Sequence, residues 1–438
     1  MKNDARELSV KILINFDKTH KQLNEIQNKF FLNNNYNTQV KSRSKVLTNE
    51  IIRFKGRIDY IIEQISGKKN KNFNKNLISI LRLAIYEILF DPKIPDYASV
   101  NTAVDLTKIN LNKKASGLTN AVLRKLIRIK EEKKNWDEKF KTDKKWNSFP
   151  IWIQNRFSNQ HNEINAKLFF QSFNKSPETF VRNDSQLSIF DLKDNLYRNN
   201  IKSLIFNEFF LKIKNGSKDI LDNEFFQSGQ ISIQDPASYG IIECLDIHKD
   251  DVILDVCAAP GTKSLAMSYL VGEKGKILSS DINNSRVEMG RKDLKRNNRK
   301  NIIWSVKDAS KDTFPIVNKI LVDAPCSGLG VLRRKPDIRW RRKEKEITFF
   351  SNLQLKILCH MSSFLKPGGV LVYGTCSIDK KENFNVVQNF LKINKDFKLD
   401  KMPNTIDREL IDENYCFSTI NVIDNLDGMF AARLKKND

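Results

Sequence analysis

The 438-residue sequence has few residues that could hold a metal ion or build a disulfide framework. It contains six cysteines, none of them in a CxxC pair, and four histidines that are scattered along the chain. This pattern argues against both a zinc ribbon and a disulfide scaffold. We therefore predict no metal site. Because intracellular thiols stay reduced, some of the cysteines are available for chemistry.

Long apolar runs are also missing. No stretch reaches the roughly 18 to 20 apolar residues that a membrane-spanning helix needs, and the first ten residues, MKNDARELSV, lack the apolar core of a secretory signal. Hydrophobic residues make up 40% of the chain and charged residues 29%, as in soluble globular proteins. We expect a cytoplasmic protein without a membrane partner, and the length predicts two or three domains.

Acidic residues are too few to balance the basic ones, and the formal net charge is +23. An AT-rich genome, which favours Lys, Asn and Ile, alone raises this charge, so its distribution is more informative. Residues 1–145 hold 31 Lys and Arg against 16 Asp and Glu, a net of +15, whereas the rest of the chain has a net of +8. The asymmetry favours contact between the first third and nucleic acid.

The first third is predicted to be all-helical. In segment 46–66 apolar residues recur in steps of four and three, which traces one face of a helix. Segment 77–89 repeats the pattern before Pro92 and Pro95 end it. The Lys- and Glu-rich stretch 129–146 is expected to be a solvated linker or a helix end. Further helices are expected over about 5–16, 97–109 and 117–130.

Residues 146–235 are predicted to form a small α/β connecting region, with short strands at 178–182 and 230–234. From residue 236 the pattern becomes regular, because apolar β-rich runs alternate with helix-like segments. These runs are VILDV (252–256), KILSSD (276–281), NIIWSV (301–306), KILVDAP (319–325) and GGVLVYGT (368–375). They predict a mostly parallel, Rossmann-like sheet covered on both faces, which binds ligands at the carboxyl ends of its strands.

Polar motifs follow the first three of these strands. The first strand runs into a loop of small residues whose N–H groups can approach a nucleotide-like ligand, although a plain βα turn remains an alternative. This loop consists of Cys257, Ala258, Ala259, Pro260, Gly261, Thr262 and Lys263. Asp281 ends the second strand, where it could accept hydrogen bonds from ribose hydroxyls. Asp308 follows the third and could accept from an adenine amino group; a loop cap is the alternative for each acid.

The fourth and fifth strands each deliver a cysteine. DAPCSG places Cys326 just after Asp323, and GTCS places Cys376 at the end of the last strand. Both are expected at the ligand-binding edge, where a cation such as Lys263 can favour a thiolate. Three other cysteines are expected to be small buried hydrophobes, namely Cys244, Cys359 and Cys416.

Together, DVCAAPGTK, DAPCSG and GTCS resemble the RNA cytosine-5 methyltransferase family that includes the RsmB/Sun proteins. The resemblance covers about residues 230–435, with IQDPAS (233–238), RRKPDIRW (333–340) and DGMFAARL (427–434). Residues 1–135 are similar to the NusB domain in IPDYASVNTAVDLTK and LTNAVLRK. Within the family this fusion is characteristic of the bacterial enzyme that methylates one cytosine of 16S rRNA.

The resemblance implies an all-α NusB-like domain followed, over residues 236–438, by a class I methyltransferase domain. It implies S-adenosylmethionine as the cofactor, held by the small-residue loop with Asp281, Asp308 and Asp323. Cys376 would attack carbon 6 of the base, and Cys326 would assist release of the adduct. Asp323 would hydrogen-bond the ring at N3, and Lys263 would lower the thiolate pKa or orient the base.

Other interpretations stay open. The same chemistry could act on tRNA or 23S rRNA; a DNA cytosine methyltransferase would use one Cys after Pro and would not need Cys376. A non-catalytic RNA-binding antitermination or assembly factor would explain the basic helical domain but not the two thiols. The charged run 333–343 is either a solvated face or a phosphate contact in which Trp340 packs or stacks. We expect a monomer whose partner is 16S rRNA, naked or in an early small-subunit intermediate.

Overall fold

The computed structural model describes residues 4–32, 36–132, 135–215, 217–420 and 426–438. Contacts divide the chain into two compact units. The helical unit comprises Met1–Ser176 together with Leu332–Arg342, and the α/β unit comprises Pro177–Val331 together with Lys343–Asp438.

The helical unit is all-α, as predicted. Its helices bury apolar faces against one another in a single core built largely from Ile and Leu. The described helices of this unit are α1 (Ala5–Lys18), α2 (Leu23–Leu32), α3 (Thr38–Arg53), α4 (Lys55–Ser66), α5 (Lys75–Phe90), α6 (Asp96–Asn110), α7 (Lys113–Glu132), α8 (Glu138–Lys141), α9 (Ile151–Phe173) and α16 (Ile338–Arg341), with 3-10 turns η1 (Asn70–Asn72) and η2 (Lys144–Asn147).

The helix predicted over 46–66 is two helices. Phe54 separates α3 from α4 with φ −93° and ψ 8°. The Ser148 hydroxyl enters the joint, because it donates to the Arg53 carbonyl over 2.7 Å and accepts from the Gly56 amide over 3.0 Å. The apolar spacing continues through the joint, so periodicity alone could not locate it.

Two further expectations for this region are corrected. Helix α7 ends within the stretch 129–146, which agrees with one of the two expected possibilities. The other, a solvated linker, does not fit the part around Phe140, because Phe140 is buried and its ring lies 5.8 Å from that of Trp136 and 6.2 Å from that of Trp146. The expected connecting region 146–235 is divided at Ser176. Helix α9 stays with the helical unit through its phenylalanines, and its last carbonyl, at Phe173, accepts from Arg53.

The α/β unit begins with a small antiparallel sheet in the order β2-β3-β1-β4. One side of this sheet packs against α10 around a core of Leu, Ile and Val side chains. The elements are β1 (Thr179–Asn183), α10 (Ile189–Arg198), β2 (Ser203–Ile205), β3 (Phe210–Ile213), α11 (Ser217–Leu221), α12 (Glu224–Gln227) and β4 (Ile231–Ile233).

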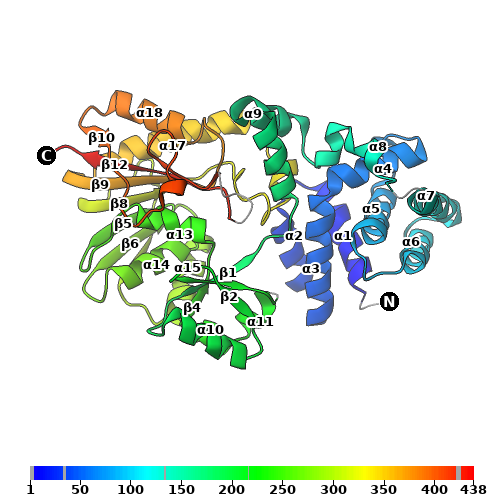
Figure 1. The fold of residues 1–438 in the computed structure, drawn as a ribbon, viewed down its shortest axis with the longest axis horizontal. Coiled ribbons are helices and arrows are strands. Elements are labelled where there is room, and N and C mark those ends of the chain that lie inside the picture. The colour runs from blue at the N-terminus through cyan, green and yellow to red at the C-terminus, as the bar shows by residue number, and fades with distance from the viewer. Residues whose placement is uncertain (1–3, 33–35, 133–134, 216, 421–425) are drawn as a thin grey trace. The chain divides into compact units, whose positions relative to one another are not determined.

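The larger sheet confirms the predicted Rossmann-like fold. Its path is β10-β12-β9-β8-β5-β6-β7, parallel from β9 to β7, with β12 inserted antiparallel and β11 paired to β12. Helices α17 and α18 lie over one face and α14 and α15 over the other (Figure 1). Its elements are α13 (Pro236–Glu243), β5 (Val252–Val256), α14 (Thr262–Leu270), β6 (Lys276–Asp281), α15 (Asn284–Arg296), β7 (Ile302–Val306), β8 (Val317–Asp323), α17 (Lys345–Ser362), β9 (Leu365–Thr375), α18 (Phe384–Ile393), β10 (Phe397–Leu399), η3 (Arg408–Leu410), β11 (Phe417–Ser418) and β12 (Phe430–Lys436).

Within the described ranges, no helix has the length and apolar character needed to cross a membrane. The same residues contain no cluster of three or more His, Cys, Asp or Glu side chains arranged to hold a metal ion.

Candidate active site

Two cysteine thiols meet where the central strands end. Strands β8 and β9 are parallel neighbours, with Asp323 opposite Gly374, so the loops after them leave the sheet at the same edge. The Sγ atoms of Cys326 and Cys376 lie 3.2 Å apart, and both side chains are partly exposed. The structure therefore brings both candidate catalytic cysteines into contact.

The environment of Cys326 opposes its ionisation. The hydrogen bond with Cys376 raises the pKa of Cys326 well above its usual value, and burial and the negative charges of Cys376 and Glu382 add to this effect. A charge on Cys376 thus holds the proton on Cys326. Cys326 is therefore the member of the pair that is harder to ionise.

An ion pair lies beside the thiols. Lys263, in the first turn of α14, places Nζ 2.8 Å from Oδ2 of Asp323, and its side chain is only 13% exposed. Burial would lower the pKa of Lys263, but the charges of Asp323 and Cys376 outweigh it, and the pKa is raised. Lys263 is therefore a cation at neutral pH that interacts electrostatically with both Asp323 and Cys376.

The small-residue loop after β5 is tied to the end of β6. The Ala259 amide donates to Oδ2 of Asp281 over 3.2 Å, and Asp281 is 3% exposed. Gly261 has φ +107°, and a Cβ there would lie 2.6 Å from the Trp304 ring, so only glycine fits. The remaining loop positions follow β5 directly, and Thr262 opens α14. The loop and Asp281 therefore form one site edge.

Asp308 lies in a turn beyond β7 at this same edge. Its Oδ1 accepts from both the amide and the hydroxyl of Ser310, at 2.9 and 2.8 Å. The hydrogen bond from the Ser310 amide is the main cause that lowers the Asp308 pKa. This carboxylate stabilises its own turn, and it remains a predicted adenine contact.

Asp255, which opens the motif DVCAAPGTK, is a buried carboxyl group to which the sequence assigned no role in the site. It is fully buried at the end of β5 and accepts from the Ser264 hydroxyl over 2.5 Å. Its Oδ1 has no hydrogen-bond partner in the structure, and burial raises its pKa to about 7. Its place near the end of the apolar run VILDV gave no reason to expect a buried carboxyl group with an unpaired oxygen.

Comparison with known proteins agrees with this geometry. Residues 242–435 match the family described as 16S rRNA methyltransferase RsmB/F, and residues 3–128 match the NusB family. The α/β unit carries an RsmB/F methyltransferase domain. The chain is 29% identical over 412 residues to the probable ribosomal RNA small subunit methyltransferase B of Bacillus subtilis (strain 168), covering 91% of this chain and 90% of that protein.

Other relatives agree. Ribosomal RNA small subunit methyltransferase B of Shewanella oneidensis is 36% identical over 222 residues, half of this chain and 51% of that protein. Among solved structures, that of PH0851 has a TM-score of 0.77 at 24% identity and covers 99% of both chains. NSun6 from Pyrococcus horikoshii, solved with SFG, has a TM-score of 0.59 at 21% identity and covers 66% of this chain and 99% of that one. These two structures share the fold.

The charged run 333–343 differs from the prediction. Arg339 is fully buried in the helical unit, where its guanidinium donates to Asn174 over 2.8 Å and to the Phe173 carbonyl over 3.1 Å. Trp340 donates its Nε1 to the Ile52 carbonyl over 2.9 Å. The centre of the run is therefore neither a solvated face nor a phosphate contact. Trp340 packs, which was one of the two expected possibilities.

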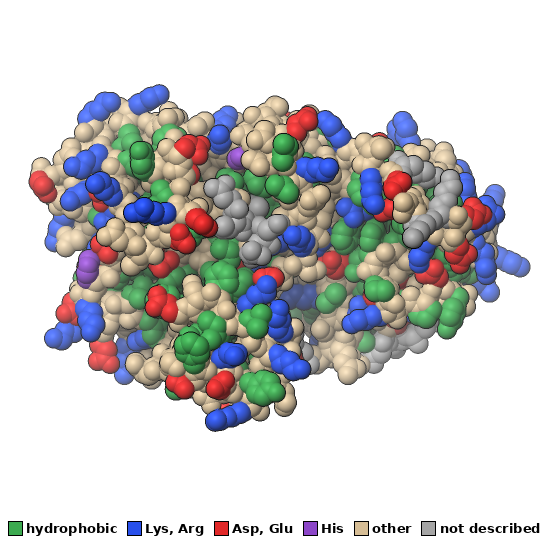
Figure 2. Space-filling model, viewed as in Figure 1, with side chains coloured by type: hydrophobic (Ala, Val, Ile, Leu, Met, Phe, Trp, Pro, Cys, Tyr) green, Lys and Arg blue, Asp and Glu red, His purple; other side chains and the backbone are tan. Residues whose placement is uncertain are grey.

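Basic side chains do not gather into one patch on the face drawn in Figure 2. Lys and Arg side chains are dispersed there, and acidic side chains lie among them. This face therefore does not concentrate the excess charge of the first third.

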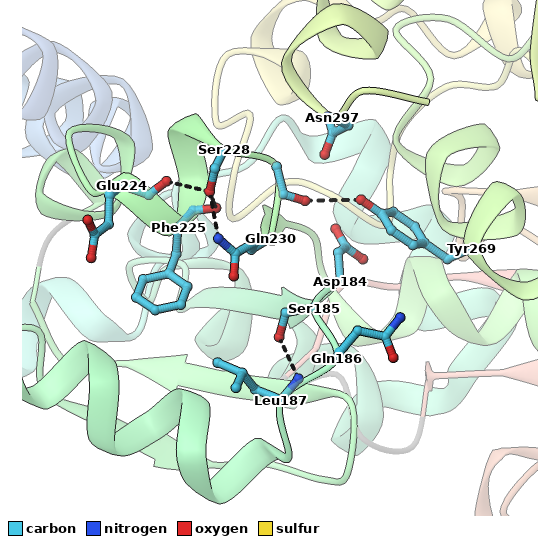
Figure 3. A pocket seen from close by; sticks show the side chains of 11 residues that line it. Asp184, Ser185, Gln186, Leu187, Glu224, Phe225, Ser228, Gln230, Tyr269 and Asn297 are labelled. Carbon is cyan, nitrogen blue, oxygen red and sulfur yellow. Dashed lines mark hydrogen bonds between the residues drawn. The ribbon is translucent and has the colours of Figure 1, made fainter. Parts of the chain in front are cut away.

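A hollow of about 750 Å³ lies elsewhere in the α/β unit, beside the small sheet (Figure 3). Several of its polar groups pair with one another, such as Gln230 with Ser228 and Tyr269 with the Gly229 carbonyl. None of the predicted site residues lines it. It is therefore separate from the thiol site.

Proposed function

We propose that this protein transfers a methyl group from S-adenosylmethionine to carbon 5 of a cytosine in 16S rRNA, through a covalent bond between Cys376 and carbon 6 of the base. The observation that carries the proposal is the contact between the two thiols at the edge of the sheet, 3.2 Å from sulfur to sulfur. A methyltransferase acting on an already nucleophilic atom would need no such pair.

The residues present fit S-adenosylmethionine. The loop Cys257–Lys263 offers backbone N–H groups, Asp281 is anchored beside it, and the unpaired Oδ1 of Asp255 is buried beneath the same edge. Asp281 would hold the ribose and Asp308 the adenine. The loop and Asp323 would hold the rest of the cofactor. When bound, this cofactor supplies an electrophilic methyl group.

Each catalytic side chain has a role that its environment supports. The Cys376 thiolate adds to carbon 6, which makes carbon 5 nucleophilic. N3 takes up a proton as the thiolate adds, so that no net negative charge builds on the ring, and the Asp323 carboxylate accepts a hydrogen bond from that N3–H, while the cation of Lys263 holds Asp323 and favours the thiolate. After methylation the proton on carbon 5 passes to solvent water, and its bonding electrons re-form the double bond between carbons 5 and 6. The bond between Cys376 and carbon 6 breaks in the same step, Cys376 leaves as a thiolate, and Cys326 assists this release.

Bisulfite sequencing tests the proposal, because it detects cytosines methylated at carbon 5. Purified protein is incubated with S-adenosylmethionine and 16S rRNA, and in parallel with 23S rRNA, tRNA or small-subunit intermediates. We expect one protected cytosine in 16S rRNA and none with Cys376→Ala, which should still bind the cofactor. Full turnover by Cys376→Ala would exclude the covalent mechanism. A cytosine protected in tRNA or 23S rRNA, with none protected in 16S rRNA, would exclude 16S rRNA as the substrate.

A further inference from the structure

Glu382 lies between the two cysteine loops, although it belongs to neither. Its side chain is fully buried, and its carboxylate accepts hydrogen bonds from the residues that directly follow the two cysteines. Oε1 accepts from the Ser327 amide over 2.7 Å. Oε2 accepts from the Ser377 hydroxyl over 2.7 Å and from the Ser327 hydroxyl.

Neighbouring groups extend these contacts. Gln354 of α17 donates one N–H to Oε1 of Glu382 over 3.2 Å and another to the Pro325 carbonyl over 3.0 Å. Asn383 accepts from the Thr375 hydroxyl over 2.7 Å and donates to the Ser377 carbonyl over 2.9 Å. The residues on both sides of each cysteine are thus fixed by one small network centred on Glu382.

A network of this kind restricts the backbone at both cysteines. The strands β8 and β9 bring the loops to one edge, but they do not set the distance between side chains several residues beyond their ends. Polar groups with several buried partners are costly to displace, because each broken hydrogen bond leaves an unpaired buried group. Sulfur atoms at 3.2 Å need such a restraint, since two side chains on loops otherwise sample several rotamers.

We propose that Glu382 is a positioning residue that holds the Cys326 and Cys376 loops together, so that the two sulfurs stay in contact. The importance of that contact for turnover rests on the proposed function. The carboxylate itself touches neither the base nor the cofactor. Its contribution is geometric and acts through Ser327 and Ser377.

Glutamine and alanine separate geometry from charge at this position. In Glu382→Gln the amide oxygen can still accept from the Ser327 amide and from Gln354, and the amide nitrogen can donate to the two serine hydroxyls, which rotate to accept. In Glu382→Ala every one of these contacts is lost. The matched control is Glu243→Ala, which removes a different glutamate of the α/β unit. Burial raises the pKa of Glu243 to about 7.

The first measurement does not depend on methyl transfer. Mild oxidation with diamide removes the two thiol hydrogens and joins Cys326 to Cys376, and the disulfide is quantified by peptide mass spectrometry. A disulfide requires Cβ atoms within about 4.5 Å, so we expect Glu382→Ala to slow cross-linking about ten-fold or more. The wild-type protein, Glu382→Gln and Glu243→Ala should cross-link at equal rates.

The second measurement is methylation of 16S rRNA. We expect Glu382→Ala to lower kcat about 100-fold with little change in KM, because a displacement of about 1 Å at reacting groups has effects of this size. Glu382→Gln should restore most of kcat. Wild-type cross-linking and turnover in Glu382→Ala would overturn the inference, and so would a Gln variant as defective as the Ala variant.

If Glu382→Ala does not fold, Ser377→Ala removes one of the contacts at lower cost and should show the same changes to a smaller degree. Normal cross-linking and kcat in Ser377→Ala would then count against the inference. A wild-type protein that cross-links rapidly but methylates no cytosine would refute the proposed function and leave the geometric claim intact.

Discussion

The amide of Gly330 donates to the carbonyl of Cys376 over 3.0 Å, which joins the segment after Cys326 to the loop of the other cysteine. The Gly330 carbonyl accepts from the amide of Gly428 over 2.8 Å, so a third segment meets the same point. A Cβ at Gly330 would lie 1.8 Å from the Gly428 carbonyl oxygen. The three backbones can approach this closely only because the position is a glycine.

Gly330→Ala should therefore displace the Cys376 loop. We expect kcat for methyl transfer to fall about 100-fold, because the reacting thiol is misplaced while the cofactor loop is untouched. Calorimetric titration with S-adenosylmethionine should give a Kd close to that of the wild-type protein. Unchanged kcat would show that the Cys376 loop tolerates the shift, and a lost cofactor site would show that the disturbance is not local.

Cys326→Ala should trap the covalent intermediate. In the proposed mechanism Cys326, whose pKa is raised and whose sulfur contacts Cys376, assists after Cys376 has added to the base. Without it the adduct should accumulate and be seen as a denaturant-stable band that joins protein and RNA. Cys326→Ala/Cys376→Ala is the control and should give no band. If Cys326→Ala turns over normally, Cys326 does not assist release of the adduct, and the roles proposed for the two cysteines are wrong.

The sequence was sufficient to predict the parallel strands of the large sheet and the position of Cys326 and Cys376 at the same edge. Each apolar run predicted a strand, and parallel neighbours end at the same edge, so Cys326 and Cys376 had to be close. Sheet topology thus accounts for the two loops sharing one edge, although it does not set the distance between the sulfur atoms.

Features made by contacts between distant residues could not be predicted in this way. The joint at Phe54 depends on Ser148, which lies 92 residues from Gly56. The burial of Arg339 depends on partners more than a hundred residues away. Glu382 carries no local signal either, because an acid in a Lys-rich loop is typical of a solvated segment. A charged side chain is usually exposed, unless buried partners from distant parts of the chain form hydrogen bonds or ion pairs with it.

Asp255 should give the α/β unit a measurable pH dependence. Its folded pKa of about 7 is raised above the unfolded value, so its contribution is complete below about pH 4 and is lost as pH rises towards 7. The loss is at most about 4 kcal/mol, from about 1.4 kcal/mol per pKa unit. Asp255→Asn should therefore lose less Tm than the wild-type protein between pH 5 and pH 8. Parallel Tm curves for the two proteins would contradict the raised pKa.

Two helix glycines of the helical unit test the packing of Trp340. A Cβ at Gly56 in α4 would lie 2.9 Å from the Trp340 ring and 2.9 Å from the Ser148 Cα, whereas a Cβ at Gly117 in α7 would meet nothing within 4 Å. Gly56→Ala should destabilise this unit by about 1–3 kcal/mol through overpacking. Gly117→Ala, the matched control, should stabilise it by about 0.5–1 kcal/mol, because alanine favours helix.

Thermal unfolding followed by circular dichroism measures both changes, and a double-mutant cycle identifies the contact. If the Trp340 ring is what the new methyl group strikes, Gly56→Ala should cost less in a Trp340→Leu background than in the wild-type protein, because the leucine leaves room on that side. Part of the cost should persist, since the Ser148 backbone remains. Strictly additive effects would mean that Trp340 does not pack on α4, and that the segment Leu332–Arg342 does not belong to the helical core.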